Sequence, residues 1–371
     1  METDLLIVGA GIAGASLAAA VAAERMTVLV EAEDMPGRHA TGRSAAFYDE
    51  SYGGPGIQPL TTAAGPMLRS PGEEMGGHSF LRPRGGLIIA RNGDEALLDA
   101  MVADFAGTPV SLDPVSGACL STMLPGLLPG WSSALAQPQC EDIDVAALHH
   151  ANLALARRRG ATLLTRSPFT GAVRRSDGRW QVQSGSLSLT ASVIVNAAGA
   201  WADQVAGLAG AAPMGITPYR RTMVQLRLGR ETPASLPLVI DARGEFYFKG
   251  EGVGRIWLSP HDETADFPHD VAAEEHDIAL AIHRFQQVVD WPIAAVERRW
   301  AGLRSFAPDR LPVLGFAPDM PGFFWCAGQG GFGIQTAPSA ALLAASLLLT
   351  RDPDPRISTI DATIYSPSRF A

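Results

Sequence analysis

The stretch LLIVGAGIAG, residues 5–14, decides the fold of this chain. Its first four residues form a short apolar run of the kind found in buried parallel strands. Residues 12–24 are rich in alanine and favour a helix, and residues 27–30, TVLV, predict a second strand. The order strand, glycine-rich turn, helix, strand is that of a unit that binds a dinucleotide.

Each glycine of the turn has a separate task. Gly9 allows the tight turn, Gly11 lets the backbone approach a pyrophosphate, and Gly14 lets the helix pack closely on the strand. The N-terminus of the helix offers free N–H groups to the phosphates. Glu31 follows Gly11 by 20 residues, where a carboxylate hydrogen-bonds ribose hydroxyls. Because that carboxylate would repel a 2′-phosphate, the pattern disfavours NADP.

Length and composition limit the remaining choices. A chain of 371 residues suggests two domains, and 47% hydrophobic against 18% charged residues provides for a large core. The net charge of −9, with no block of Lys or Arg, disfavours a nucleic-acid partner or an anionic membrane surface. The uncharged run 5–23 has an acidic flank and is broken by the three glycines, so we expect no transmembrane segment.

The cysteines indicate the compartment. Cys119, Cys140 and Cys326 are odd in number and show no C-x-x-C spacing. We therefore expect neither a disulfide framework nor a metal site, and a reducing cytoplasm is the simplest location.

The first unit alone leaves NAD and FAD both open. A nicotinamide-binding domain would continue with further strand–helix units, whereas residues 36–48, PGRHATGRSAAFY, predict a polar loop. Arg43 and Ser44 in this loop are expected to reach the pyrophosphate or a flavin.

Three more segments carry a family resemblance. They are ATGRSAA (40–46), VIVNAAGAWADQVAGLAG (193–210) and a late region that runs from WAGLRSF (300–306) to QGGFGIQTAPSAA (329–341). With the first unit, they resemble the D-amino acid oxidase/glycine oxidase superfamily of FAD enzymes over essentially the whole chain. The closest resemblance is to D-amino acid dehydrogenases of the D-arginine dehydrogenase type.

The resemblance implies an α/β fold in which a Rossmann-like FAD-binding domain is interleaved with an α+β substrate domain built on a mixed sheet. We expect the FAD-binding domain to be discontinuous, over residues 1–50, 140–210 and 300–371. The substrate domain then takes 51–139 and 211–299.

The late glycine-rich loop is expected to complete the cofactor site. It precedes a predicted helix over 339–349, with Pro338 near its first turn. The resemblance places this helix against the carbonyl edge of the flavin, with Gly328, Gly330, Gly331 and Gln335 at the cofactor. Residues 305–317 hold no cysteine, so we expect FAD to be bound non-covalently.

The resemblance also implies the substrate residues. Arg221 and Arg304 match the arginines that hold the α-carboxylate, and an arginine fork suits that task. Tyr247 matches a tyrosine that adds its hydroxyl, and Tyr52 matches one on a closing loop. Adjacent residues of a strand face opposite ways, so only one of Arg220 and Arg221 can face the site.

Two departures bear on specificity. The arginine-specific type has a glutamate where this chain has Gly86, and a histidine where it has Phe47. Both changes remove polar partners for a cationic side chain. We therefore expect a neutral or apolar side chain, a large one included, to be preferred over Arg or Lys.

The expected reaction is oxidative deamination of a D-amino acid. Hydride moves from the substrate Cα to flavin N5, and the imino acid hydrolyses to a 2-oxo acid and ammonia. The alternatives are oxidation of a sarcosine-like secondary amine or a 2-hydroxy acid, or a flavoprotein subunit of a larger complex. The sequence identifies no general base, and oxygen, a quinone or an electron-transfer protein all remain open as electron acceptor.

Overall fold

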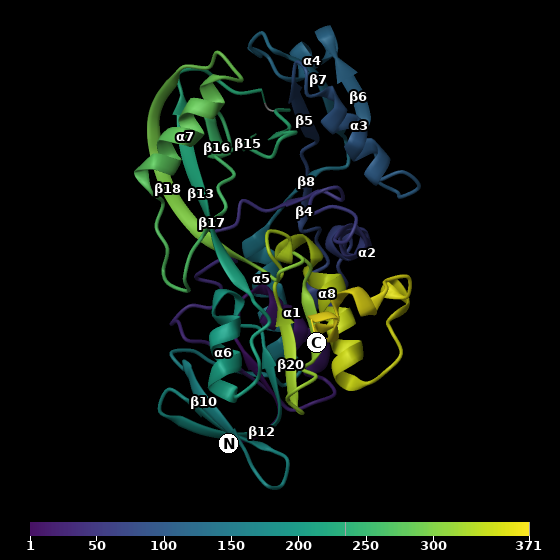
Figure 1. Ribbon diagram of the computed structural model, residues 1–371, viewed down its shortest axis with the longest axis vertical. Coiled ribbons are helices and arrows are strands. Elements are labelled where there is room, and N and C mark those ends of the chain that lie inside the picture. The colour runs from purple at the N-terminus through teal and green to yellow at the C-terminus, as the bar shows by residue number, and fades with distance from the viewer. Residues whose placement is uncertain (234, 371) are drawn as a thin grey trace.

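The computed structural model describes residues 1–233 and 235–370, and two large sheets organise it (Figure 1). An eight-stranded sheet has the order β10-β11-β12-β1-β2-β9, and β20 pairs with both β12 and β19. Its strands are β1 (Glu2–Val8), β2 (Thr27–Val30), β9 (Thr162–Leu164), β10 (Phe169–Arg174), β11 (Trp180–Ser184), β12 (Leu187–Asn196), β19 (Val313–Phe316) and β20 (Phe323–Ala327).

Strand β1 shows why this sheet is buried on both faces. Its side chains alternate, so Leu5 and Ile7 join the core under α1, α5 and α8, while Leu6 and Val8 join the core under α6. An apolar run without polar alternation is what a strand covered on both sides requires. The helices are α1 (Ile12–Val21), α5 (Val145–Arg158), α6 (Ala202–Ala209) and α8 (Gly333–Leu349).

The parallel pairing confirms the dinucleotide-binding unit. β1 pairs in parallel with β2 and with β12, so a strand from the middle of the chain returns beside the first one. β11 and β12 form an antiparallel hairpin at the edge of this parallel pairing. The expected α/β architecture with a mixed second sheet is correct.

The second sheet has nine strands in the order β17-β13-β16-β15-β14-β5-β7-β6, with β18 beside β13. Its members are β5 (Gly86–Arg91), β6 (Asp113–Ser116), β7 (Trp131–Gln137), β13 (Thr217–Leu228), β14 (Leu238–Asp241), β15 (Tyr247–Gly250), β16 (Arg255–Ser259), β17 (Thr264–Ala265) and β18 (Ile293–Phe306). Three helices accompany it, α3 (Glu95–Asp104), α4 (Gly117–Met123) and α7 (Glu275–Gln286).

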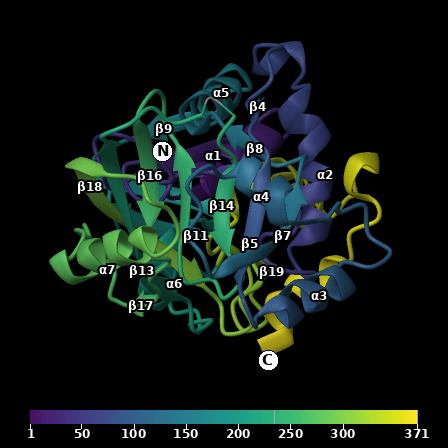
Figure 2. The ribbon, with the colours of Figure 1, turned by 90° about the horizontal axis from the view of Figure 1, so that it is seen from above.

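Alternation on β15 separates the core of this sheet from the site. Phe246, which precedes the strand, and Phe248 pack with Phe285 of α7. Tyr247 and Lys249 therefore face the opposite side, toward the first sheet. β3 (Phe47–Tyr48), β8 (Glu141–Ile143) and β4 (Leu81–Pro83) form a small sheet, and Figure 1 shows β4 and β8 between the two large sheets. Figure 2, seen from above, shows α7 beside β13 and β16.

Two details differ from the sequence prediction. Helix α8 begins at Gly333, not near 339, so Pro338 lies inside it. Packing of the Ala- and Leu-rich face outweighs the glycine and proline content there. Helix α2 (Gln58–Arg69) packs with the eight-stranded sheet, which we call the dinucleotide-type sheet. Leu60 lies in the core of that sheet, and Leu60 O accepts a hydrogen bond of 2.6 Å from Ser339 Oγ. We therefore propose to move the first domain edge from residue 50 to about residue 85.

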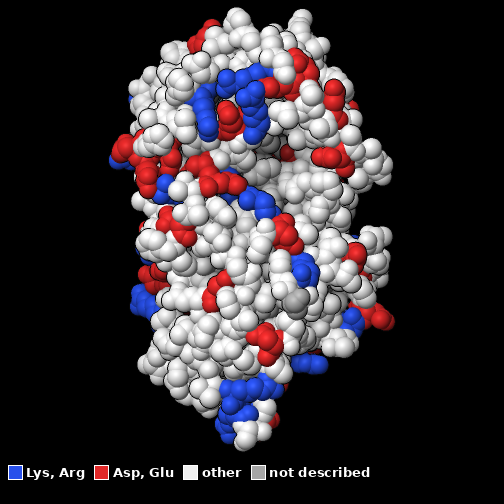
Figure 3. All heavy atoms as spheres, viewed as in Figure 1, with Lys and Arg blue, Asp and Glu red and all other residues white. Residues whose placement is uncertain are grey.

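The face drawn in Figure 3 is not dominated by either positive or negative charge. Acidic and basic side chains are interspersed there in small groups, and uncharged residues cover most of the area. Within the described residues, no helix is both long and apolar enough to cross a membrane.

A Gly14→Ala substitution tests the packing of the first unit. A Cβ at Gly14 would lie 2.0 Å from Gly9 O, so we expect a loss of about 1–3 kcal/mol in the free energy of unfolding, measured by chemical denaturation. Gly207→Ala is the matched control, because Gly207 lies in α6 with no atom within 4 Å of its added Cβ. That variant should be unchanged or more stable. Equal stability of both variants would contradict the packing role of Gly14.

Candidate functional site

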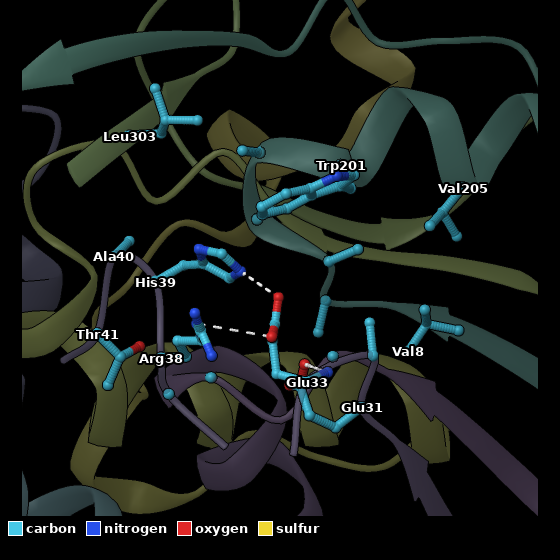
Figure 4. A pocket seen from close by; sticks show the side chains of 18 of the residues that line it. Val8, Glu31, Glu33, Arg38, His39, Ala40, Thr41, Trp201, Val205 and Leu303 are labelled. Carbon is cyan, nitrogen blue, oxygen red and sulfur yellow. Dashed lines mark hydrogen bonds and ion pairs between the residues drawn. The ribbon is translucent and has the colours of Figure 1, made fainter. Parts of the chain in front are cut away.

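A continuous trough runs along the carboxyl edge of the dinucleotide-type sheet. Two cavities of about 370 Å³ and 130 Å³ share lining residues at the glycine turn, among them Gly11 and Thr41. The larger cavity begins at Glu31 (Figure 4), and the smaller one ends at Gly331 and Gly333. The N-termini of α1 and α8 thus open into one trough and give it two positive dipole ends.

The end near Glu31 has the features of a ribose site. The Glu31 carboxylate accepts hydrogen bonds from Ala10 N at 2.9 Å and Glu33 N at 3.1 Å. Each oxygen keeps a second lone pair, and the group faces the cavity among the side chains drawn in Figure 4. Gly9 and Gly11 line the trough, whereas Gly14 lies beneath the turn.

In the loop after Glu31, the side chain of Arg43 contacts the second sheet. Its guanidinium donates to Val271 O at 2.8 Å and Ala301 O at 3.0 Å, and it pairs with Asp270. These bonds tie the loop to the second sheet. Arg43 also lines both cavities of the trough, so its expected contact with the cofactor stays a prediction. Ser44 lines the smaller cavity, and its expected contact with the pyrophosphate or the flavin stays a prediction.

Of the predicted glycines in the late loop, two line a cavity and one does not. Gly330 and Gly331 line the smaller cavity, and a Cβ on Gly331 would lie 2.8 Å from Arg304 Nη1. Gly328 lines none of the described cavities; its φ of +72° makes a turn against Ile216 and Ala307.

Gln335 has a structural task, and its expected contact with the cofactor stays a prediction. Its amide accepts from Asp49 N at 3.1 Å and donates to Tyr52 O at 3.2 Å and to Thr61 Oγ1 at 3.0 Å. These bonds fix the segment that carries Tyr52. The partners of Gly328 and Gln335 lie far along the chain, and the local sequence does not reveal them.

Strand register brings two arginines to one face. In the antiparallel pair β13–β18, Arg221 lies opposite Gly302 and Tyr219 lies opposite Arg304. Arg221 and Arg304 are therefore diagonal neighbours on the face toward the trough. Arg220 faces the other way and is bound by Asp266, Glu274 and Asp277.

Arg221 is held on one side only. Its Nε donates to Asp262 O at 2.8 Å, and Nη2 donates to Glu263 at 3.0 Å. The side chain is buried, and Nη1 has no partner. Burial, and the neighbouring Arg304 after it, lower the pKa of Arg221. An unpartnered guanidinium N–H at a cavity wall is a site for an anion.

Two tyrosines complete this wall. Arg304 Nη1 donates to Tyr52 Oη at 2.7 Å, and Tyr247 donates to Met223 Sδ at 3.0 Å. Burial acts to raise the pKa of Tyr52, but Arg304 and Arg221 outweigh it and the net shift is downward. The structure thus brings Arg221, Arg304, Tyr247 and Tyr52 together.

The specificity residues have different outcomes. Phe47 lines a small cavity of about 20 Å³ with Tyr52, Tyr247 and Arg304. Gly86 lines none of the described cavities, and a Cβ there would lie 2.9 Å from Gln137 Oε1. Gly86 lies opposite Gln137 in the pair β5–β7, so its neighbours are Gln137 and Cys140, and its expected role in side-chain specificity stays a prediction.

The sequence analysis missed His261 and Met223. His261 lies in the loop after β16, with its ring 5.6 Å from that of Tyr247 and 6.4 Å from that of Tyr52. Met223 follows Arg221 by two residues and so shares its strand face. That spacing could have indicated Met223, whereas no periodic signal marks His261.

Comparison with known proteins identifies the family. Residues 4–347 match the family described as DAO, FAD dependent oxidoreductase. The chain belongs to this family. It is an FAD-dependent oxidoreductase.

Individual relatives agree at the level of the fold. FAD-dependent oxidoreductase domain-containing protein 1 of Xenopus laevis is 27% identical over 206 residues, which cover 50% of this chain and 39% of that protein. The chain thus spans about two fifths of the length of that relative. The L-proline dehydrogenase of P. horikoshii has a TM-score of 0.86 at 19% identity, covering 100% of this chain and 98% of that one. Glycine oxidase of Geobacillus kaustophilus has a TM-score of 0.84 at 21% identity, covering 99% of both.

The trough fits FAD. Glu31 would hold the ribose, the turn of Gly9 and Gly11 would hold the pyrophosphate, and the N-terminus of α8 would face the flavin. The cradle depends on missing side chains, because a Cβ on Gly11 would lie 3.2 Å from Thr41 Oγ1. When bound, FAD supplies the acceptor for a hydride.

A Gly11→Val substitution tests this cradle. The added side chain would enter the trough where the pyrophosphate is expected, so the purified protein should lose its yellow flavin absorbance. Ala20→Ser is the control, since Ala20 lies on the same helix away from the trough. Retention of a full complement of flavin by Gly11→Val would contradict the placement.

Proposed function

We propose that this protein oxidises the Cα–N bond of a D-amino acid with a small, neutral side chain. The observation that carries the proposal is the guanidinium pair at the end of the trough. Arg221 Nη1 has no partner, and Arg304 has no carboxylate within 4.0 Å among the described residues. Two such cations beside a flavin site call for an anionic substrate group, and a carboxylate meets the fork geometry of arginine.

The residues bind and orient the substrate. Arg221 and Arg304 would hold the carboxylate, while Tyr52 would cover it from the segment after β3. With the carboxylate fixed, the Cα–H bond can be aimed at the flavin, and such positioning accounts for much of catalysis. The substrate loses a hydride from Cα and a proton from nitrogen. The resulting imine takes up water and releases a 2-oxo acid and ammonia.

The small cavity beside Phe47 supports a small side chain. Its volume of about 20 Å³ is near the size that one water requires. Phe47 packs edge to face against Tyr52 at 5.1 Å and Tyr247 at 6.0 Å between ring centroids. A large side chain, which the sequence analysis included, would have to displace these rings. The D configuration is supported by the resemblance of the sequence to D-amino acid dehydrogenases.

A second candidate is a small secondary amine of the sarcosine kind. It presents the same carboxylate and also fits the small cavity. A 2-hydroxy acid would use the same arginines. In each case an electron acceptor must reoxidise the flavin. A subunit without activity of its own would have no need of a complete anion site.

Substitution of either arginine tests the carboxylate site. Arg221→Met and Arg304→Met should keep FAD but lose about 2–4 kcal/mol of transition-state stabilisation, or ~30–1,000-fold in kcat/KM. Arg227→Met is the control, because Arg227 is exposed on the same strand and pairs with Glu297. If both test variants match the control in kcat/KM, the arginine pair does not bind substrate.

A panel of substrates tests the choice among these candidates. With the yellow protein under anaerobic conditions, we expect D-alanine to bleach the flavin faster than D-leucine, D-arginine or L-alanine. Fastest bleaching by sarcosine or by D-lactate would select the alternative, and fastest bleaching by D-arginine would refute the neutral pocket.

Phe47→Ala should enlarge the side-chain cavity. The rate ratio of D-leucine to D-alanine should rise about tenfold or more, the scale of discrimination by apolar pockets. Phe267→Ala, at a ring that is 67% exposed, is the control. An unchanged ratio in Phe47→Ala would place the side chain elsewhere.

A further inference from the structure

His261 lies beside the wall formed by Arg221, Arg304, Tyr52 and Tyr247, and its protonation state follows from its hydrogen bonds. Its Nδ1 lies 2.5 Å from Gly244 O. A carbonyl oxygen can only accept, so Nδ1 carries the proton. Burial, and then the charges of Arg221 and Arg304, lower the pKa of His261 to about 2. The ring is therefore neutral, and Nε2 presents a lone pair.

That lone pair faces the hydroxyl of Tyr52. His261 Nε2 lies 3.4 Å from Tyr52 Oη, which also accepts the bond of 2.7 Å from Arg304 Nη1. Arg304 can only donate, so the hydroxyl proton of Tyr52 points to His261. A directed chain results, from Arg304 through Tyr52 and His261 to Gly244 O.

The backbone holds His261 in this place. Its φ of +56° lies in the left-handed region, which a residue with a side chain adopts only when its surroundings enforce it. Ser259 Oγ accepts from His261 N at 3.1 Å. Arg284 of α7 donates to Pro260 O and Glu245 O, and so ties together the two loops that hold the ring.

We propose that His261 is a positioning residue that keeps Tyr52 protonated and thereby keeps the arginine pair available to a carboxylate. The inference rests on the proposed carboxylate site. The charged and titratable groups around this unit come from each packed element: Arg304 on β18, Arg221 on β13, Tyr247 on β15, Arg284 on α7 and Glu263 in the loop after β16.

The physical reason is a competition for the proton of Tyr52. Two guanidinium groups favour the tyrosinate form, and they lower the pKa of Tyr52. A hydrogen bond from the neutral hydroxyl to His261 favours the protonated form and opposes that shift. A tyrosinate would neutralise Arg304 and repel an incoming carboxylate. Loss of His261 should therefore move the ionisation of Tyr52 to lower pH.

The test measures binding of acetate to the FAD-loaded protein, from the perturbation of the flavin spectrum, between pH about 6 and 10. His261→Asn is suited to it, because Asn tolerates the left-handed region and its side chain is too short to reach Tyr52. His283→Asn, at an exposed position of α7, is the control. Acetate is fully ionised throughout this range, so a change in its Kd reports the protein.

We expect the alkaline weakening of acetate binding to begin about one pH unit lower in His261→Asn than in the wild type or the control. Tyr52→Phe should abolish the weakening of acetate binding at high pH. The double variant Tyr52→Phe/His261→Asn should behave like Tyr52→Phe. A His261→Asn limb that coincides with the wild-type limb would overturn the role of His261. A wild type that does not bind acetate, or binds it as tightly after Arg221→Met, would instead refute the carboxylate site itself.

Discussion

The guanidinium groups of Arg221 and Arg304, placed on one face of one sheet, are the constraint on which the site depends. Within the described residues, two carboxylates pair with Arg221, Glu263 at 3.0 Å and Asp262 at 3.9 Å, and none lies within 4.0 Å of Arg304. Leaving a cation partly unpaired away from water costs several kcal/mol in free energy. A site that retains this cost is organised for an anion that arrives from outside. The bonds around Arg221 then fix its direction without filling Nη1.

Each large sheet supplies one half of the arrangement. The dinucleotide-type sheet presents the helix N-termini and Glu31 along one trough, and the nine-stranded sheet presents the arginines and Tyr247 at the end of it. Gly302, opposite Arg221, is where the second sheet comes close to the loop of Arg43, with a Cβ position 3.4 Å from Arg43 Cβ. The ties from Arg43 to Val271 and Ala301 join the two halves there.

Periodic and conformational signals were readable from the sequence. The apolar run of β1, the glycine turn and Glu31 specify the first unit, because each follows from local geometry. Strand alternation correctly separated Arg221 from Arg220. The hydrogen-bond and packing partners of Arg43, Gln335 and Gly86 could not be predicted from the sequence, because the fold brings each partner from far along the chain. His261 has no periodic signal at all, since its place is set by a left-handed backbone and by Gly244.

A structure of the FAD-loaded protein with bound acetate tests the central claim most directly. We predict one acetate at the end of the trough, with its oxygens within hydrogen-bond distance of Arg221 Nη1 and the Arg304 guanidinium. Tyr52 should close over the bound ion from its side. Acetate bound elsewhere, with Arg221 and Arg304 turned to carboxylates of the protein, would contradict the account.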